Sequence, residues 1–310
     1  MHIDQDAQRN GFDVEHEKLS HLSMTSLTSL GVGLGLKPQF FEEALDAHAE
    51  GLWWEVHPEN YMVDGGPRLS WLHAIRQKHP VSFHSVSLSL GSACLPDAQQ
   101  VARLRTLVDR YEPALVSEHL AWSVWQGQYF PDLLPVQRDA ETLSHLVRNI
   151  QYVQEALGRT IAIENPSHYL AFSEPNGEHT WDEIDFLIEL HRRSGCQLLV
   201  DVNNIAVSAN NLGFDAIQHL DRWPADAIAE IHLAGHSLDP AWGEALWIDS
   251  HDQPISAQVW FLYERLIARI GQRPTLIERD DNLPSFDTLM QERLCAHQLL
   301  STANGLTHHD

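Results

Sequence analysis

The chain has 310 residues, and 43 Asp and Glu against 20 Lys and Arg give it a formal net charge of −23. This negative charge argues against nucleic acid or an anionic membrane as a partner, because both select basic surfaces. A hydrophobic fraction of 43% is enough for a packed core. The length fits a single α/β barrel, which typically takes about 250 residues.

Two finer counts bear on compartment and chemistry. There are three cysteines without a CxxC pair, the polar amino terminus lacks an apolar signal region, and no apolar run reaches membrane-spanning length. We therefore expect a cytoplasmic protein without a disulfide framework. Histidine is abundant, at 20 residues, whereas the only lysines are Lys18, Lys37 and Lys78.

The predicted elements alternate regularly after an expected flexible tail at residues 1–30. Short apolar runs predict strands at 31–36, 52–57, 81–86, 114–119, 160–165, 196–202, 228–233 and 275–279. Helical patterns begin near Pro38, Pro67, Pro96, Arg138, Thr180, Phe214 and Ser256, and after Pro284.

Eight such units predict a single (β/α)8 TIM barrel over residues 31–303, followed by a short tail at 304–310. The runs are nearly continuously apolar, as expected for parallel strands buried on both faces. A doubly wound open sheet is the alternative, but no GxGxxG follows the first strand. Three long loops would lie over the carboxyl ends of the strands, at 120–137, 166–179 and 234–255.

Polar residues stand where the predicted strands end, which is the active-site face of barrel enzymes. These residues are His57, His84, Glu118, His119, Glu164, Asn165, Asp201, Asn203, Asn204, His232 and Glu278. Buried ionisable groups are costly unless they are paired or metal-bound. Asp249 and His251, in the last long loop, form an Asp-x-His pair of further candidate ligands. The set lacks cysteine and exceeds the needs of one ion, so it predicts two or three iron, zinc or manganese ions.

Several of these residues also have a simpler interpretation. A single histidine such as His84 on an apolar strand is more often a core residue than a ligand. The ligand-type residues at the other strand ends favour the ligand interpretation here. Asp201 could instead cap a helix. His57 could belong to a turn, and Glu118 could support a ligand rather than bind the metal.

Eight segments in order resemble one known family. They are EVHPENY (55–61), SFHSVSLSLGS (82–92), LVSEHLAWS (115–123), IENPSHYL (163–170), LLVDVNNIAVSANN (198–211), EIHLAGH (230–236), IDSHDQPI (248–255) and TLIERDDNLPSF (275–286). The chain resembles the multinuclear non-haem iron-dependent oxidative enzymes, the UPF0276-type barrels that include the iron subunit of methanobactin biosynthesis. More distantly, it is similar to the trinuclear zinc barrel of endonuclease IV, in the xylose-isomerase-like superfamily.

The resemblance implies a set of metal ligands in this chain. They are His84, His119, Glu164, Asp201, His232, Asp249, His251 and Glu278. Asn204 stands where the zinc enzymes have a histidine, which favours iron and leaves occupancy of a third metal position open. Supporting or substrate-binding roles are expected for His57, Glu59, Asn60, Glu118, Asn165, Asn203, His236 and Asp280. No catalytic residue is expected beyond the metal cluster.

The resemblance also implies an activity. A mixed-valent Fe(II)/Fe(III) centre would bind a substrate cysteine thiolate and dioxygen and oxidise that cysteine in a ribosomally made precursor peptide. A separate protein that binds the leader peptide is the expected partner.

The alternatives are a metal-dependent phosphoesterase or nuclease and a sugar isomerase on the same barrel. The negative charge argues against the nuclease. The isomerase usually recruits a barrel lysine, and the polar strand ends above contain none. Metal storage is a further, non-enzymatic alternative.

Overall fold

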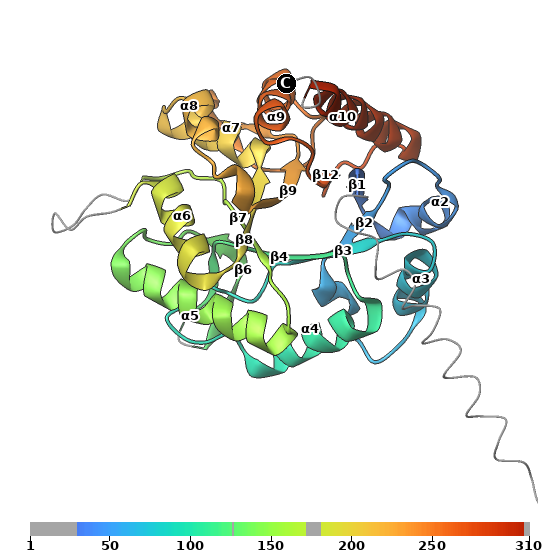
Figure 1. The fold of residues 1–310 in the computed structure, drawn as a ribbon, viewed down its shortest axis with the longest axis horizontal. Coiled ribbons are helices and arrows are strands. Elements are labelled where there is room, and N and C mark those ends of the chain that lie inside the picture. The colour runs from blue at the N-terminus through green and yellow to red at the C-terminus, as the bar shows by residue number, and fades with distance from the viewer. Residues whose placement is uncertain (1–29, 126, 172–180, 307–310) are drawn as a thin grey trace, which may run out of the picture.

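The eight predicted apolar runs form parallel strands that close into a barrel (Figure 1). The computed structural model describes residues 30–125, 127–171 and 181–306. The strand order is β1-β12-β9-β8-β7-β4-β3-β2. The strands are β1 (Val32–Gly35), β2 (Trp54–Val56), β3 (Val81–Ser85), β4 (Leu115–His119), β7 (Ala162–Glu164), β8 (Gln197–Asp201), β9 (Ile228–Leu233) and β12 (Thr275–Ile277). Each lies within its predicted range, and the single (β/α)8 barrel is confirmed.

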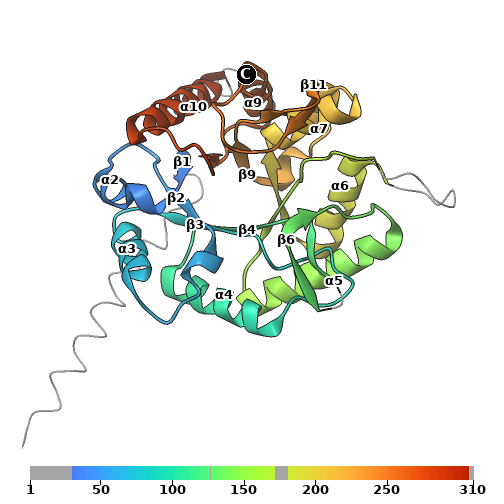
Figure 2. The same cartoon turned by 180° about the vertical axis from the view of Figure 1, so that it is seen from behind.

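Helices surround this barrel on its outside, as Figure 2 shows from behind. They are α2 (Phe41–Asp46), α3 (Pro67–Arg76), α4 (Ala98–Tyr111), α5 (Ala140–Leu157), α6 (Glu183–Ser194), α7 (Val202–Leu212), α8 (Ala216–Asp221), α9 (Ala257–Ile270) and α10 (Phe286–Leu306), with short 3-10 turns η2 (Pro38–Phe40), η3 (Pro58–Tyr61) and η4 (Ala225–Ala227). The predicted starts are confirmed to within a few residues, and α6 begins three residues after Thr180. Thr180 itself and residues 1–29 of the tail predicted at 1–30 lie outside the described residues.

Local sequence signals explain where these helices begin and end. The Asp139 carboxylate accepts a hydrogen bond from the Thr142 amide at 2.7 Å and so caps α5. Gly158 ends the same helix with a φ of +65°, a conformation in which glycine is least strained. Ser256 caps α9 in the same manner as Asp139 caps α5.

The structure also contains elements that the sequence analysis did not predict. Helix α7 follows β8 without a loop, where only a helix near Phe214 was expected. Two of the predicted long loops fold into hairpins, β5 (Trp122–Trp125) with β6 (Gln128–Leu134), and β10 (Ser237–Asp239) with β11 (Gly243–Ile248). Helix α7 was not predicted because no turn residue separates it from β8, and the segment CQLLVDVNNIAV is mostly apolar throughout.

The barrel interior changes character along its axis. Side chains alternate between the two faces of a strand, so residues two apart on one strand share a face. An apolar cluster including Trp53, Leu115, Leu199 and Leu276 fills the amino-terminal part of the strands. The inward positions that follow on the same strands are polar (Glu55, Ser117, Asp201 and Glu278), which places a polar layer above the apolar one.

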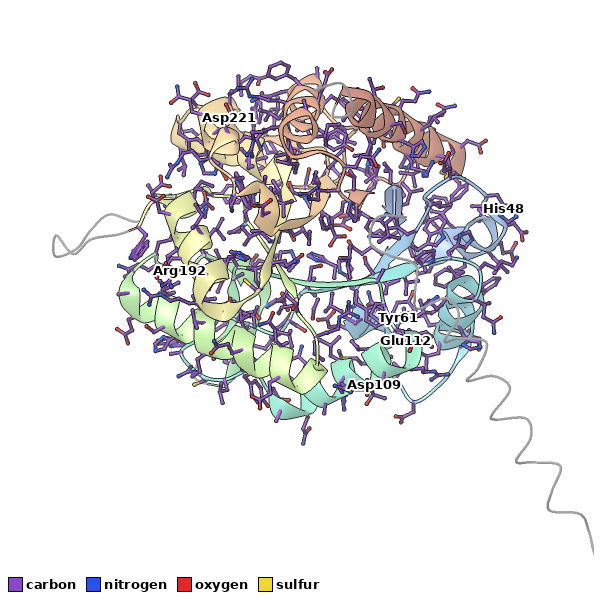
Figure 3. The ribbon with its side chains drawn as sticks, in the orientation of Figure 1. His48, Tyr61, Asp109, Glu112, Arg192 and Asp221 are labelled. Carbon is purple, nitrogen blue, oxygen red and sulfur yellow. The ribbon has the colours of Figure 1, made fainter. Side chains whose placement is uncertain are left out.

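The outer surface carries most of the remaining charge. Figure 3 shows Asp109, Arg192 and Asp221 on the outer helices. Among the described residues, no helix combines the length and the apolar character needed to cross a lipid bilayer.

Candidate metal centre

Three donor atoms from three neighbouring strands converge at the carboxyl end of the barrel. The Nε2 atoms of His84 and His119 lie 3.2 Å apart. The Glu164 Oε2 atom is 3.1 Å from the first and 3.3 Å from the second. Donors that share one ion at about 2.0–2.1 Å lie about 3.0–3.4 Å from one another. The three atoms therefore have the mutual spacing of ligands to a single ion.

A second group of donors lies beside the first and shares Glu164 with it. The Nδ1 atom of His232 is 3.1 Å from Glu278 Oε2 and 4.0 Å from Glu164 Oε1. Asp201, Glu164 and His232 each offer one ligand atom within 4.8 Å of the other two. Glu164 thus presents one carboxylate oxygen to each group, as a bridging carboxylate would.

The loop after β11 brings a third pair of donors to the same place. His251 Nε2 lies 2.7 Å from Asp249 Oδ1, and His251, Asp201 and Glu278 form another possible ligand group. The backbone of His251 has a φ of +50°, in the sparsely populated left-handed region. Such conformations persist where the surroundings enforce them, and here the Asp280 amide donates to the His251 carbonyl at 2.9 Å.

Several of these side-chain atoms are buried without a hydrogen-bond partner in the described part of the chain. Buried polar atoms are normally satisfied, because an unmade hydrogen bond costs about 1–3 kcal/mol. The unsatisfied atoms are Glu164 Oε2, Asp201 Oδ2, Asn204 Oδ1, His232 Nε2 and His251 Nε2. Each belongs to a predicted ligand, and all but His232 Nε2, which lies next to Glu55 and Glu230, face the converging donors. Their chemistry and their lack of partners fit a site built for metal ions.

The charges of the group lie close enough to shift one another's protonation. Burial opposes protonation of His84, but the Glu164 and Glu55 charges outweigh it and raise the pKa of His84 to about 10. Burial likewise opposes ionisation of Glu164, yet the neighbouring histidines lower its pKa to about 2. Burial raises the pKa of Asp201 well above its usual value, and Glu164 adds to that effect. Cations placed among these groups would favour the ionised form of every carboxylate.

Asp201 caps a helix, and its second oxygen stays available for the ligand role predicted for it. Its Oδ1 atom accepts from the Asn204 amide at 2.6 Å and caps α7, while its Oδ2 atom is the buried unpartnered one. Asn204 lies beside it, and its side-chain nitrogen donates to the Asn165 carbonyl, which leaves Oδ1 directed elsewhere. The structure therefore places both residues at the converging donors.

The sequence analysis missed two carboxylates directly below the converging donors. Glu55 and Glu230 lie inside the barrel and are almost completely buried, at 4% and 0% exposed. They face the Nε2 atom of His232 at 3.6 and 3.7 Å. Burial raises the pKa of Glu230 to about 7, whereas His232 outweighs the effect of burial at Glu55 and lowers its pKa. Their positions before the strand end gave no signal in the sequence.

Two of the expected supporting residues, Glu59 and Glu118, accept hydrogen bonds next to the candidate ligands. Glu59 accepts from Ser85 and Val86 and fixes the loop after β3. Glu118 accepts from the amides of Leu88 and His119.

Two asparagines hold the next pair of strands and the last loop. Asn165 exchanges two hydrogen bonds with the backbone of Asp201. Asn203 donates to Asp249 at 2.9 Å and contacts His236 Nδ1, whose ring stacks on Trp247. These residues position the loops and strands that carry the candidate ligands.

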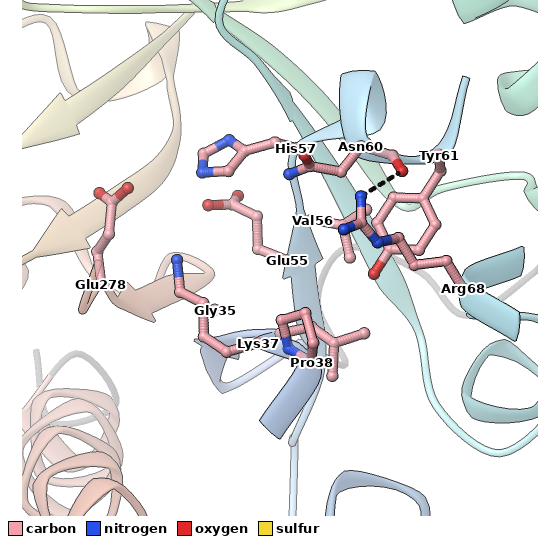
Figure 4. Close-up of a pocket in the computed structure, with 11 residues that line it drawn as sticks. Gly35, Lys37, Pro38, Glu55, Val56, His57, Asn60, Tyr61, Arg68 and Glu278 are labelled. Atoms are coloured by element: carbon pink, nitrogen blue, oxygen red, sulfur yellow. Dashed lines mark hydrogen bonds between the residues drawn. The ribbon is translucent and has the colours of Figure 1, made fainter. Parts of the chain in front are cut away.

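His57 and Asp280 lie at the rim of the group. His57 Nδ1 is 3.0 Å from the His84 carbonyl, and Asp280 Oδ2 is 3.2 Å from His251 Nδ1. The other Asp280 oxygen accepts from Lys37 Nζ at 2.6 Å. The polar strand ends contain no lysine, as expected, but Lys37 follows β1 directly and extends toward the carboxyl ends of the strands (Figure 4).

A cavity of about 520 Å³ opens from these donors to the surface. It is bounded by the β6 strand, by the segment after β7 and by the loop after β11. Its lining includes His119, Glu164, Asn204, Asp249, His251 and Glu278. Candidate ligands are therefore accessible to a substrate that enters past β6 and the loop after β11.

Comparison with known proteins places the chain in a family. A family model described as RiPP precursor modification enzyme MbnB/TglH/ChrH matches residues 31–301, which is nearly the whole barrel. The chain belongs to this family. RiPPs are ribosomally synthesised and post-translationally modified peptides, so the family acts on precursor peptides and its members are enzymes.

The similar proteins of this MbnB/TglH/ChrH family are named UPF0276 proteins. A UPF0276 protein of Caulobacter sp. strain K31 is 59% identical over 269 residues, covering 87% of this chain and 96% of the relative. A UPF0276 protein of Paraburkholderia phytofirmans is 44% identical over 283 residues, covering 89% and 91%.

Among solved structures, a xylose isomerase domain protein from Alicyclobacillus acidocaldarius has a TM-score of 0.53 at 14% identity, covering 89% and 99% of the chains. Endonuclease IV from Thermus thermophilus has a TM-score of 0.50 at 14% identity, with the same coverage. At such low identity these likenesses show the barrel fold and carry no function with them.

Proposed function

We propose that this protein is an iron-dependent oxidase that uses dioxygen to modify cysteine in a ribosomally made precursor peptide. The observation that carries the proposal is the set of converging buried donors, several of them unpartnered, at the base of an open cavity. Histidine nitrogens and carboxylate oxygens suit iron, and two or three ions suit the number of donors. Zinc and manganese use the same donors, so metal content has to be measured.

The proposed ligands are those that the structure brings together. His84, His119 and Glu164 would hold one ion, and Glu164 with Asp201, His232 and Glu278 a second. Asp249, His251 and Asn204 would complete a third position, in which the neutral Asn204 oxygen is the weakest donor. Bound iron would supply open coordination positions for a thiolate and for dioxygen, together with the redox chemistry.

The remaining residues would position these ligands and shape the substrate's path. Asp280 holds the ring of His251 through Nδ1, and Ser117 contacts His84 Nδ1 at 2.8 Å. Such contacts fix which ring nitrogen faces the metal and raise its basicity. Leu133, Leu134 and Pro166 line the cavity above and would exclude water from the bound cysteine. With no cysteine of this chain among the donors, the thiolate would come from the peptide.

A separate protein that binds the leader part of the peptide is part of the proposal. The described cavity reaches from the surface to the candidate ligands, but its volume of about 520 Å³ holds only a few residues. A precursor peptide is longer than that. We expect the leader to be held outside this cavity by the partner.

The test combines metal content with peptide mass. Protein purified without oxygen is analysed for iron, then supplied with ferrous iron, dioxygen and a cysteine-containing precursor peptide encoded beside its gene. We expect bound iron and a change in peptide mass that disappears when the cysteine is replaced by serine. Absence of iron together with an unchanged peptide would refute the proposal.

A matched pair of variants tests the ligand assignment. Glu164→Gln removes the proposed bridging charge while keeping the side-chain shape, and should lower iron content by at least one ion per chain. Glu155→Gln makes the same change at an exposed position on α5 and should leave iron content unchanged. Equal iron in both variants would contradict the assignment.

A further inference from the structure

A smaller cavity, here called the side pocket, adjoins the proposed metal centre (Figure 4). It has a volume of about 110 Å³ and lies between the residues that follow β1 and β2 and the start of α3. His57 and Glu278 line both the side pocket and the larger cavity. A group in the side pocket would therefore lie next to the candidate ligands. Nothing in the family description assigns a role to this pocket.

The side pocket gathers positive charge in a chain that has little of it. Lys37 and Arg68 both line it, out of 20 Lys and Arg in a chain of net charge −23. In the described part of the chain Arg68 faces no carboxylate within ion-pairing distance, and its Nη1 atom donates only to the Asn60 carbonyl, at 3.3 Å. Lys37 already holds Asp280, but its ammonium group has three N–H donors.

A third donor in the side pocket is the Tyr61 hydroxyl. The Tyr61 ring is 3% exposed, and its hydroxyl has no hydrogen-bond partner within the described residues. Burial raises the pKa of Tyr61 to about 12, despite the opposing charge of Arg68. The hydroxyl therefore keeps its proton at neutral pH and remains a donor. The opposite side of the pocket carries the carboxylates of Glu55 and Glu278, so an anion would be directed toward Arg68 and Tyr61.

We propose that the side pocket binds a carboxylate of the peptide substrate through Arg68 and Tyr61, with Lys37 at its inner edge. This inference rests on the proposed function, because it places the carboxylate within one or two residues of the reacting cysteine. The volume of about 110 Å³ is enough for a carboxylate and its adjoining carbon. Binding there would fix which cysteine reaches the metal ligands.

The carboxylate has two possible sources, an acidic side chain beside the cysteine or the carboxyl terminus of the peptide. Short peptides in matched pairs distinguish them: acetyl-Asp-Cys-amide against acetyl-Asn-Cys-amide, and acetyl-Gly-Cys with a free carboxylate against its amide. Their dissociation constants are measured by calorimetry on protein loaded with zinc, so that no oxidation interferes. We expect the carboxylate member of at least one pair to bind about tenfold more tightly.

Variants connect that preference to the side pocket. Arg68→Gln and Tyr61→Phe should each reduce the preference for the carboxylate peptide to about threefold or less. Tyr61→Phe is the milder change, because it removes only a hydroxyl. Arg103→Gln removes the same charge from an exposed position on α4 and should leave the preference intact. Lys37 is not substituted, because its Asp280 partner contacts the candidate ligand His251.

The outcomes separate this inference from the proposed function. Equal affinity within both pairs, or a preference that survives Arg68→Gln and Tyr61→Phe, overturns the side-pocket assignment while thiolate binding stands. If acetyl-Gly-Ser with a free carboxylate binds in an Arg68-dependent manner as tightly as the cysteine peptide, the pocket stands and thiolate binding fails. Absence of binding by every peptide overturns both.

Discussion

At the scale of single residues, Asp201 shows how one side chain can serve the fold and the site at once. One oxygen caps α7 through the Asn204 amide, and the other is buried without a partner beside Glu164 and Glu278. Asparagine caps helices about as well as aspartate does, but it cannot supply a negative charge. The two roles can therefore be separated by one substitution.

We expect Asp201→Asn to lose metal while keeping its fold. The cap hydrogen bond is retained, so the free energy of unfolding of the metal-free protein should change by less than about 1 kcal/mol, or increase, because a buried carboxylate of raised pKa is removed. Metal content measured by mass spectrometry should fall by at least one ion per chain. Asp139→Asn makes the same exchange at the α5 cap and serves as the control. A metal content equal to the control would remove Asp201 from the proposed ligands.

The sequence could predict which residues converge where their position and their chemistry coincided. Strand ends such as His84, His119 and Glu164 could be found because each closes an apolar run on the face where barrel sites form. Glu55 and Glu230 could not, since they lie before the ends of their runs. The closed barrel brings Glu55 to His232, whereas Glu230 precedes His232 by two positions on β9 and shares its face. Lys37 was missed because its long side chain returns to the face from beyond its strand.

At the scale of elements, a buried ion-pair cluster joins the segment after β7 to the outer helices. His168 follows β7, and its Nε2 atom lies 2.7 Å from Glu183 at the start of α6. The other Glu183 oxygen lies 3.5 Å from His219 on α8. Burial opposes ionisation of Glu183, but the His168 hydrogen bond and charge outweigh it and lower its pKa. The cluster supports one wall of the large cavity, to which His168 itself belongs.

The lowered pKa of Glu183 predicts a pH-dependent contribution to stability. Its folded pKa lies below the unfolded value of about 4.5, so the stabilisation is fully present above pH 4.5 and is lost as the pH falls through the folded pKa. Glu183→Gln should therefore lower the free energy of unfolding by about 1–3 kcal/mol at pH 7, with a smaller difference from the native protein below pH 4.5.

Urea denaturation at pH 7, 5 and 4 measures this difference. Glu264→Gln, at an exposed position on α9, should change the free energy of unfolding by less than about 0.5 kcal/mol at each pH. A loss for Glu183→Gln that stays constant down to pH 4, or grows, would show that the ionised carboxylate is not the source.

The elements themselves were predicted unequally, for physical reasons. The barrel strands were evident because each is an apolar run bounded by turn residues. Helix α7 was hidden because no turn separates it from β8, and the hairpins β5–β6 and β10–β11 because their strands are half exposed and lack a regular alternation. Strand β6 and the residues directly after β11 line the cavity together with the segment after β7, so the unpredicted hairpins contribute to the access to the site.

At the scale of the whole molecule, the barrel interior concentrates negative charge that its own side chains compensate only in part. Glu55, Glu164, Asp201, Glu230 and Glu278 are all at most 6% exposed within one polar layer. Histidines His84, His119 and His232 supply the compensating charge only when they are protonated. Burying several coupled ionisable groups without full compensation is costly, so a metal-free barrel is expected to be less stable than a loaded one.

This expectation leads to a prediction about metal removal. Each ion that binds only the folded chain adds about 2.7 kcal/mol to its stability at a free concentration one hundred times the dissociation constant. For a chain of this size that corresponds to a rise of roughly 5 °C in Tm for each ion. Removing metal with a chelator should lower the Tm measured by circular dichroism by about 5–15 °C, and ferrous iron should restore it. When iron is added back to the metal-free variants, the Tm of Glu164→Gln should rise by less than that of Glu155→Gln. A Tm that is the same with and without metal would contradict a metal centre built into the barrel interior.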